Sequence, residues 1–419
     1  MNSQLEAPVG GVKPTSGLQT LANNLASGLV RGKEKLAVNE SKSPLPTLLE
    51  WAVKERIDTL IEILVAMKGA VITANSLRSP RVLHDAVPGD HHQTWILVLS
   101  RHGMHADTSL RERGYTALQK VSEEGNLSAI CALLEAGADV NAPPATDDGR
   151  TALQFAAGGG HHVALDMLLK AGAEVNAPPS RSTGRTALQA AADGGHHVAL
   201  DMLLKAGADT NAPPAPDSGR TALQAAAGGG HHVALDMLLK AGADVNAPPV
   251  EWYGFTALQA AAGGGHHVVL DMLLKAGADV NAPPAKGCGR TALQAAAGGG
   301  HHIALDMLLK AGADVNAPAA QTCGRTALQA AAGGGHHVTL DMLLKAGADV
   351  NAPSAEWDGR TALQAAAGGG HHVAVDMLLK AGAEVNAPPG GYWGCTALQA
   401  ATNGGHQNAL EMLLKAGAA

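Results

Sequence analysis

Short apolar runs alternate with glycine breaks along most of the chain, and the pattern returns every 35 residues from Thr116 onward. In the copy that begins at Thr221, residues 221–227 are rich in Ala and favour a helix. Residues 228–230 are three glycines, which break that helix and permit a tight reversal. Residues 231–241 then place apolar side chains on one face of a second helix. That apolar stripe consists of Ala234, Leu235, Leu238 and Leu239.

Polar and turn-forming residues mark the outer face and the end of the second predicted helix. Asp236 and Lys240 are four residues apart in the favourable order for an ion pair on the outer face. Gly242 is a natural residue to end the helix, and Asn246 with Pro248 begins an extended turn. One copy cannot bury its own apolar stripe, whereas stacked copies can, so the pattern predicts a solenoid.

Nine clear copies and two degenerate ones give a prediction of about eleven repeats. The clear copies begin at Thr116, Thr151, Thr186, Thr221, Thr256, Thr291, Thr326, Thr361 and Thr396. We predict a disordered N-terminal arm over 1–45, two degenerate repeats over 46–115 and nine repeats over 116–419. In the last copy polar residues replace three repeat positions, and Asn408, in place of the usual Val, predicts a polar end cap.

Residues 219–247 read GRTALQAAAGGGHHVALDMLLKAGADVNA, which resembles the ankyrin repeat. The resemblance covers 116–419 strongly and 47–115 weakly. It implies an all-α ankyrin-repeat solenoid, in which paired antiparallel helices alternate with β-hairpin fingers. Three features depart from the family pattern: Ala222 stands for the usual Pro, Gln224 stands for the usual His, and the Pro-Pro loop is two residues longer. The first helix is therefore expected to be less sharply capped, and the finger to project further.

The phrases TALQAAAGGGH and VNAPP resemble the near-identical ankyrin arrays of filamentous fungi, which are interaction modules. The resemblance implies a scaffold or adaptor that binds a protein partner through its finger loops and concave face. The alternative is a nuclear transcription coregulator that acts through a DNA-binding partner. In either role we expect a monomer in the cytoplasm or nucleus.

The copies differ mainly in the six residues after the Pro-Pro pair, which we call the finger tip, such as ATDDGR at 145–150 and VEWYGF at 250–255. Exposed aromatic side chains are typical anchors of protein interfaces, and seven of the ten aromatic residues lie in fingers. These candidate partner-binding residues are Tyr115, Trp252, Tyr253, Phe255, Trp357, Tyr392 and Trp393. The alternative for any one ring is that it folds back over its own Pro-Pro loop.

An arginine column beside the fingers supplies further candidates for partner binding. Its members are Arg150, Arg185, Arg220, Arg290, Arg325 and Arg360, of which the last four are assigned to the partner-binding site. A stacked arginine row could follow a nucleic-acid backbone. The fingers also carry Asp147, Asp148, Asp217 and Asp358, and the net charge is −7. We therefore expect a protein partner rather than direct nucleic-acid binding.

Other chemistry is weakly supported. The two side chains of each His-His pair, from 161/162 to 371/372, point in different directions from a helix, which does not suit a shared metal ion. We therefore expect these histidines to begin the second helix and to pack against the neighbouring repeat. Cys288 and Cys323 lie one repeat apart, which exceeds the reach of a disulfide. No nucleophile, base and orienting group are grouped at unique positions, so we expect no enzymatic activity and no cofactor. The sequence contains no run of about 18 apolar residues, so we expect no membrane span.

Overall fold

The structure is a computed structural model of the chain. It describes residues 115–143, 149–180, 184–216, 219–251, 254–286, 289–320, 324–353, 359–390 and 394–419. The predicted arm and the two degenerate repeats lie outside the described residues, except for Tyr115. Of the described residues, 115–121 and 126–140 belong to one compact unit, and 122–125 with those from 141 onward belong to another. Apart from Tyr115, the candidate site residues lie in the second unit.

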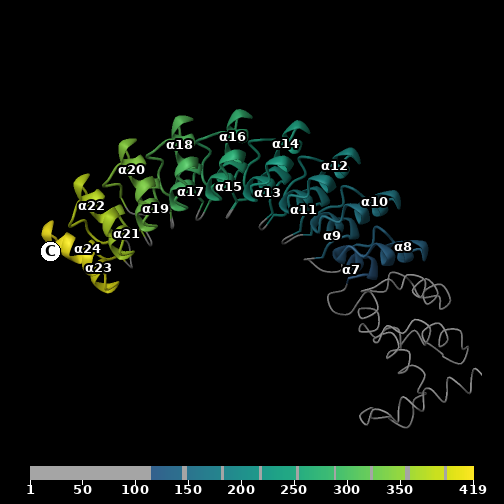
Figure 1. The fold of residues 1–419 in the computed structure, drawn as a ribbon, viewed down its shortest axis with the longest axis horizontal. Coiled ribbons are helices and arrows are strands. Elements are labelled where there is room, and N and C mark those ends of the chain that lie inside the picture. Colours follow the sequence, from purple (N-terminus) through teal and green to yellow (C-terminus); the bar gives the residue numbers. More distant parts are fainter. Residues whose placement is uncertain are drawn as a thin grey trace, which may run out of the picture. The chain divides into compact units, whose positions relative to one another are not determined.

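The described residues form helices in nine successive pairs, and no strand occurs among them (Figure 1). The first helices are α7 Ala117–Glu124, α9 Ala152–Gly158, α11 Ala187–Asp193, α13 Ala222–Gly228, α15 Ala257–Gly263, α17 Ala292–Gly298, α19 Ala327–Gly333, α21 Ala362–Gly368 and α23 Ala397–Asn403. The second helices are α8 Leu127–Glu135, α10 His162–Lys170, α12 His197–Lys205, α14 His232–Lys240, α16 His267–Lys275, α18 His302–Lys310, α20 His337–Lys345, α22 His372–Lys380 and α24 Gln407–Lys415. The predicted all-α solenoid of paired helices is confirmed.

Within the second unit the pairs stack in register, first helix on first helix and second helix on second helix. The first helices of neighbouring repeats pack more extensively than the second helices do. The row of pairs in this unit therefore curves, with the first helices on its inner, concave side (Figure 1).

The start of each first helix is firmly capped, and the expectation of a weaker cap is wrong. Thr221 has an extended backbone, and its hydroxyl oxygen accepts a hydrogen bond from the Gln224 backbone N–H at 3.2 Å. Gln224 Oε1 accepts in return from the Thr221 N–H at 3.0 Å. This reciprocal capping box satisfies two backbone donors that a helix start leaves open, and the Gln that replaces the family's His makes it possible.

Small residues build a close-packed core between the repeats. Ala226 and Ala227 of α13 are fully buried, as are Leu235 and Leu238 of α14. Leu239, predicted in the same stripe, is only half-buried. The interior repeats thus bury a narrower stripe of the second helix than the sequence pattern indicates.

The prediction that Asn408 caps the end of the array is wrong, because the Val position that it replaces is already exposed. Val233 has 46% of its surface exposed, and its equivalents in the other interior repeats range from 45% to 50%. The last repeat instead places Thr402 where interior repeats have a fully buried Ala such as Ala227. Thr402 is exposed, and its hydroxyl donates to the Leu398 carbonyl at 2.8 Å.

Candidate partner-binding site

The fingers are the segments that join each second helix to the next first helix, and in three of them a backbone hydrogen bond joins the residues on either side of the tip. Gly219 N–H donates to the Ala215 carbonyl at 2.9 Å, and Gly254 and Gly324 make the equivalent bond. A Cβ at Gly219 would collide with the backbone of Ala215, so this position requires glycine. The expected β-hairpin has no strand among the described residues of the fingers.

The glutamine of the capping box also holds the start of the finger. Gln224 Nε2 donates to the carbonyl oxygens of Ala247 and Pro248, at 3.0 and 3.1 Å. The side chain is buried, and both of its polar atoms have partners. One side chain therefore fixes where the first helix begins and where the following finger leaves the repeat. The sequence pattern did not reveal this second role, which depends on a segment 23 residues away.

An asparagine in each finger fixes the spacing to the next repeat. Asn246 Nδ2 donates to the Gly277 carbonyl at 3.1 Å, and its Oδ1 accepts from the Asp279 N–H at 2.8 Å. Both partners lie just beyond the next second helix, α16. Asn246 was predicted only as a turn residue, whereas the structure makes it one rung of a ladder of inter-repeat bonds.

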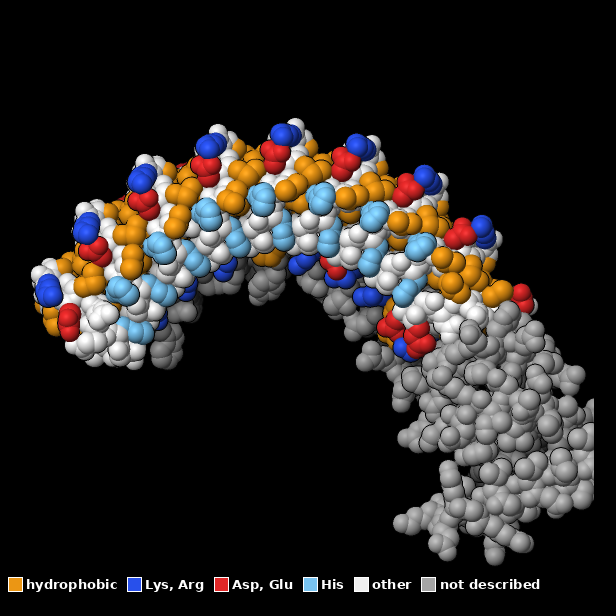
Figure 2. All heavy atoms as spheres, in the orientation of Figure 1, with side chains coloured by type: hydrophobic (Ala, Val, Ile, Leu, Met, Phe, Trp, Pro, Cys, Tyr) orange, Lys and Arg blue, Asp and Glu red, His pale blue; other side chains and the backbone are white. Residues whose placement is uncertain are grey.

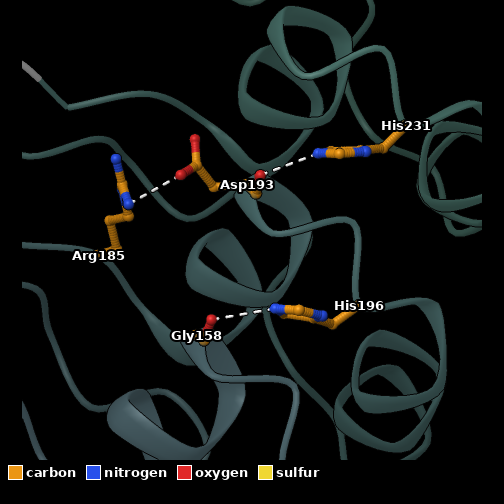
Figure 3. A network of polar contacts seen from close by, with 5 residues as sticks. All are labelled: Gly158, Arg185, Asp193, His196 and His231. Carbon is orange, nitrogen blue, oxygen red and sulfur yellow. Dashed lines mark hydrogen bonds and ion pairs between the residues drawn. The ribbon is translucent and has the colours of Figure 1, made fainter. Parts of the chain in front are cut away.

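The two histidines of each pair have different environments. His231 Nε2 donates to the Asp193 carbonyl of the preceding repeat at 3.0 Å, and His196 makes the same bond to Gly158 at 3.1 Å (Figure 3). The second member, such as His232, is exposed. The expected packing against the neighbouring repeat is therefore confirmed for the first histidine and is wrong for the second.

The glycine triplet is shaped by these histidine rings as well as by the turn. Gly230 has a φ of +71°, which side-chain-bearing residues rarely adopt. A Cβ there would lie 2.6 Å from Nδ1 of His266 in the next repeat, and a Cβ at Gly229 would collide with the ring of His231. The predicted reversal at the triplet is confirmed, and the glycines also leave room for an imidazole from each side.

Two of the predicted aromatic anchors are described, and both are half-buried: Tyr115 and Phe255. The remaining five lie outside the described residues: Trp252, Tyr253, Trp357, Tyr392 and Trp393. Their role in binding stays a prediction. Phe155, an aromatic residue outside the fingers, is buried in α9, with the Arg150 guanidinium 5.7 Å from its ring centre.

The arginine column lies along the first helices, each arginine near the end of the helix that follows it. Arg185 Nη1 is 2.9 Å from Asp193 Oδ2 at the end of α11 (Figure 3). The members of the column assigned to binding are exposed and have no ion pair among the described residues: Arg220, Arg290, Arg325 and Arg360. The column thus offers unpaired positive charge on the side of the first helices.

The outer edge, formed by the second helices, carries paired charges instead. Asp236 and Lys240 form the predicted ion pair at 2.6 Å, and the same pair recurs along the edge (Figure 2). Between neighbouring finger tips, Lys286 Nζ is 2.7 Å from Glu251 Oε1, which raises the pKa of Lys286 above its ordinary value. The arginines Arg220, Arg290, Arg325 and Arg360 therefore have free positive charge, whereas the lysines of the outer edge are paired with aspartates.

The described residues offer little for catalysis or metal binding. Cys131 Sγ donates to Glu135 Oε1 at 3.3 Å, and this bond raises the pKa of the thiol, which disfavours the reactive thiolate. Among the described residues, no three or more His, Cys, Asp or Glu side chains are grouped as metal ligands. In the same part of the chain, every helix is too short to cross a membrane.

Two family models support the same architecture. The family model described as "Ankyrin repeats (3 copies)" matches residues 143–214, 211–284, 282–354 and 353–419, and the model described as "Ankyrin repeat" matches residues 113–144. No curated protein sequence matches the chain. The crystal structure of the human ASB11 ankyrin repeat domain is similar, with 25% identity and a TM-score of 0.47, over 56% of this chain and 99% of that one.

Proposed function

The chain belongs to the ankyrin repeat family, whose repeats generally mediate protein–protein interaction, and we propose that it is an adaptor that binds a protein partner with its finger tips and concave face. The adaptor works in the cytoplasm or nucleus. The alternative is a nuclear coregulator that acts through a DNA-binding protein. Catalysis has no part in this role.

The observation that carries the proposal is that sequence variation is concentrated in the finger tips, on a nearly constant framework. The capping box, the inter-repeat histidine and the asparagine bridge recur from repeat to repeat with nearly the same distances. The tips differ, as SRSTGR at 180–185 and VEWYGF at 250–255 illustrate. The tip side chains therefore vary while the bonds of the framework stay the same.

The concave side supports the proposal because it presents little side chain to obstruct a partner. The first helices end in glycine in most repeats, as at Gly228 and Gly298, and their remaining residues are largely alanine. A partner can therefore approach the backbone closely, while the fingers and the arginine column supply the distinguishing contacts.

Affinity capture tests the proposal. The intact chain is compared with a variant in which Ser replaces Trp252, Tyr253, Trp357, Tyr392 and Trp393, and captured proteins are identified by mass spectrometry and confirmed by titration with purified protein. We expect a partner that the intact chain binds and the variant loses. A matched control carries His232→Ser and His267→Ser, on exposed positions away from the fingers. Equal capture by the intact chain and the aromatic variant would contradict the assignment of the fingers.

A further inference from the structure

The arginines at two neighbouring repeats, Arg290 and Arg325, have no ion pair among the described residues and no acidic residue in their own finger tips. Both side chains are exposed, and no ion pair to either occurs among the described residues. The preceding finger-tip residues, 285–289 and 320–324, contain no Asp or Glu. Glu251, the nearest acidic residue of the preceding finger in sequence, is already bonded to Lys286 at 2.7 Å.

In one repeat of the arginine column, the arginine is paired with a carboxylate of the chain itself. Asp193, the last residue of α11, places Oδ2 2.9 Å from Arg185 Nη1 (Figure 3). In the repeats of Arg220, Arg290, Arg325 and Arg360 the equivalent residue is glycine. The chain thus contains an internal example of the group that this arginine position binds.

In the other repeats the arginine guanidinium lies over the glycine, and no acidic side chain stands beside it there. A Cβ built on Gly298 would lie 3.5 Å from Arg290 Nη1, and one on Gly333 would lie 3.2 Å from Arg325 Nη1. Because each guanidinium is exposed and has no ion pair among the described residues, a carboxylate of a partner can bind it as Asp193 binds Arg185. Charge-assisted bonds of this kind favour the planar fork of arginine.

The distance between neighbouring repeats indicates which backbone conformation of a partner segment could contact successive arginines. Packed helices lie about 8–10 Å apart. A polyproline II segment rises about 3.1 Å per residue with three residues per turn, so every third side chain lies on one face, about 9 Å from the next. In a β-strand, successive side chains point to opposite faces, so acidic residues at every third position would face the arginine column only alternately. The match favours a polyproline II segment with an acidic residue at every third position.

We propose that Arg220, Arg290, Arg325 and Arg360 bind an acidic polyproline II segment of the protein partner. Carboxylates spaced three residues apart pair with the arginines, and an uncharged residue lies opposite Phe255, which takes the arginine's place between Arg220 and Arg290. This inference rests on the proposed adaptor function and names the partner's chemistry. The observed Arg185–Asp193 pair favours a carboxylate ligand.

Fluorescence anisotropy with the full chain tests this surface. The probe is a labelled peptide of repeated Glu-Pro-Pro triplets. Its controls are a Gln-Pro-Pro peptide of equal length and a peptide of equal composition with its glutamates in one block. A labelled single-stranded DNA oligonucleotide tests the nucleic-acid alternative. We expect the Glu-Pro-Pro peptide to bind at least roughly tenfold more tightly than either control peptide, and its affinity to fall as salt is added.

Matched variants locate the binding. Replacing both arginines, Arg290→Gln with Arg325→Gln, should weaken peptide binding roughly tenfold or more, whereas Arg185→Gln should leave it unchanged because Asp193 already occupies that arginine. Gly298→Asp should weaken binding by supplying an internal carboxylate to Arg290. Asp193→Gly should free Arg185 and tighten binding about threefold. Circular dichroism checks that each variant is folded.

Equal affinity for the Glu-Pro-Pro and Gln-Pro-Pro peptides, or full affinity in the Arg290→Gln, Arg325→Gln variant, would overturn the inference. Tighter binding of the oligonucleotide, lost in the same variant, would also overturn it, since the column would then be a phosphate site. If the peptide fails to bind while finger-dependent capture persists, this inference fails and the adaptor proposal stands. If capture fails while the peptide binds to the column, the assignment of the finger tips fails instead.

Discussion

His231 of one repeat donates a hydrogen bond from Nε2 to the main-chain carbonyl oxygen of Asp193 in the preceding repeat, 3.0 Å away. Its ring lies against Gly195, whose φ of +67° would be strained with a side chain. The same residue types meet at each boundary along the second unit. Stacking therefore depends on polar bonds as well as on the alanine and leucine core.

Replacing the first histidine of a pair should destabilise the array, and replacing the second should not. His231→Ala removes the bond to Asp193 and leaves a cavity against Gly195, so we expect the free energy of unfolding to fall by about 1–2 kcal/mol. His232→Ala, on an exposed side chain, should change it by less than about 0.5 kcal/mol. Urea unfolding followed by circular dichroism measures both, and equal effects would refute the distinction.

Two glycines with similar backbone angles should differ in their tolerance of alanine. Gly230 and Gly242 have φ values of +71° and +83°, so alanine costs about 1–2 kcal/mol of backbone strain at either position. At Gly230 the new methyl also meets the ring of His266, whereas nothing lies within 4 Å at Gly242. Gly230→Ala should therefore lower the thermal midpoint clearly more than Gly242→Ala. A larger loss at Gly242 would show that the histidine ring does not restrict this site.

The two ends of the Gln224 side chain should be separable by substitution. Gln224→Glu keeps the oxygen that accepts from Thr221 but removes the Nε2 donor and places a charge near two carbonyl oxygens. Because the site is buried, we expect a loss of about 2–4 kcal/mol in the free energy of unfolding. Gln259→Glu in the next repeat is the matched replicate. Chemical denaturation tests both, and a loss below that of an exposed substitution would contradict the buried role.

The architecture could be predicted from the sequence because the features that define it involve residues close together in the chain and recur from repeat to repeat. The Gly230 reversal, the Gly242 helix end and the Asp236–Lys240 ion pair each depend on residues a few positions apart. The double role of Gln224 and the bridge of Asn246 were not predicted, because their partners lie 23 to 33 residues away.

Positions that depend on how repeats stack were harder to predict. The two histidines of a pair recur together in the sequence and cannot be told apart there. The position of the preceding repeat determines that His231 is hydrogen-bonded and His232 is exposed. Val233 looks like a core residue by type, yet 46% of its surface is exposed. At the candidate site, the sequence marked the arginine column, whereas the Asp193 bond to Arg185 required the geometry.

The central claim is that the finger tips bind a partner while the framework supplies the stability. The most direct measurement is the affinity for the captured partner and the thermal midpoint, taken on the same preparation of the five-residue Ser variant at Trp252, Tyr253, Trp357, Tyr392 and Trp393. We predict that affinity falls by roughly a hundredfold or more while the midpoint shifts by no more than a few degrees. A variant that melts far earlier and keeps its affinity would contradict the claim, because the aromatic residues would then be structural.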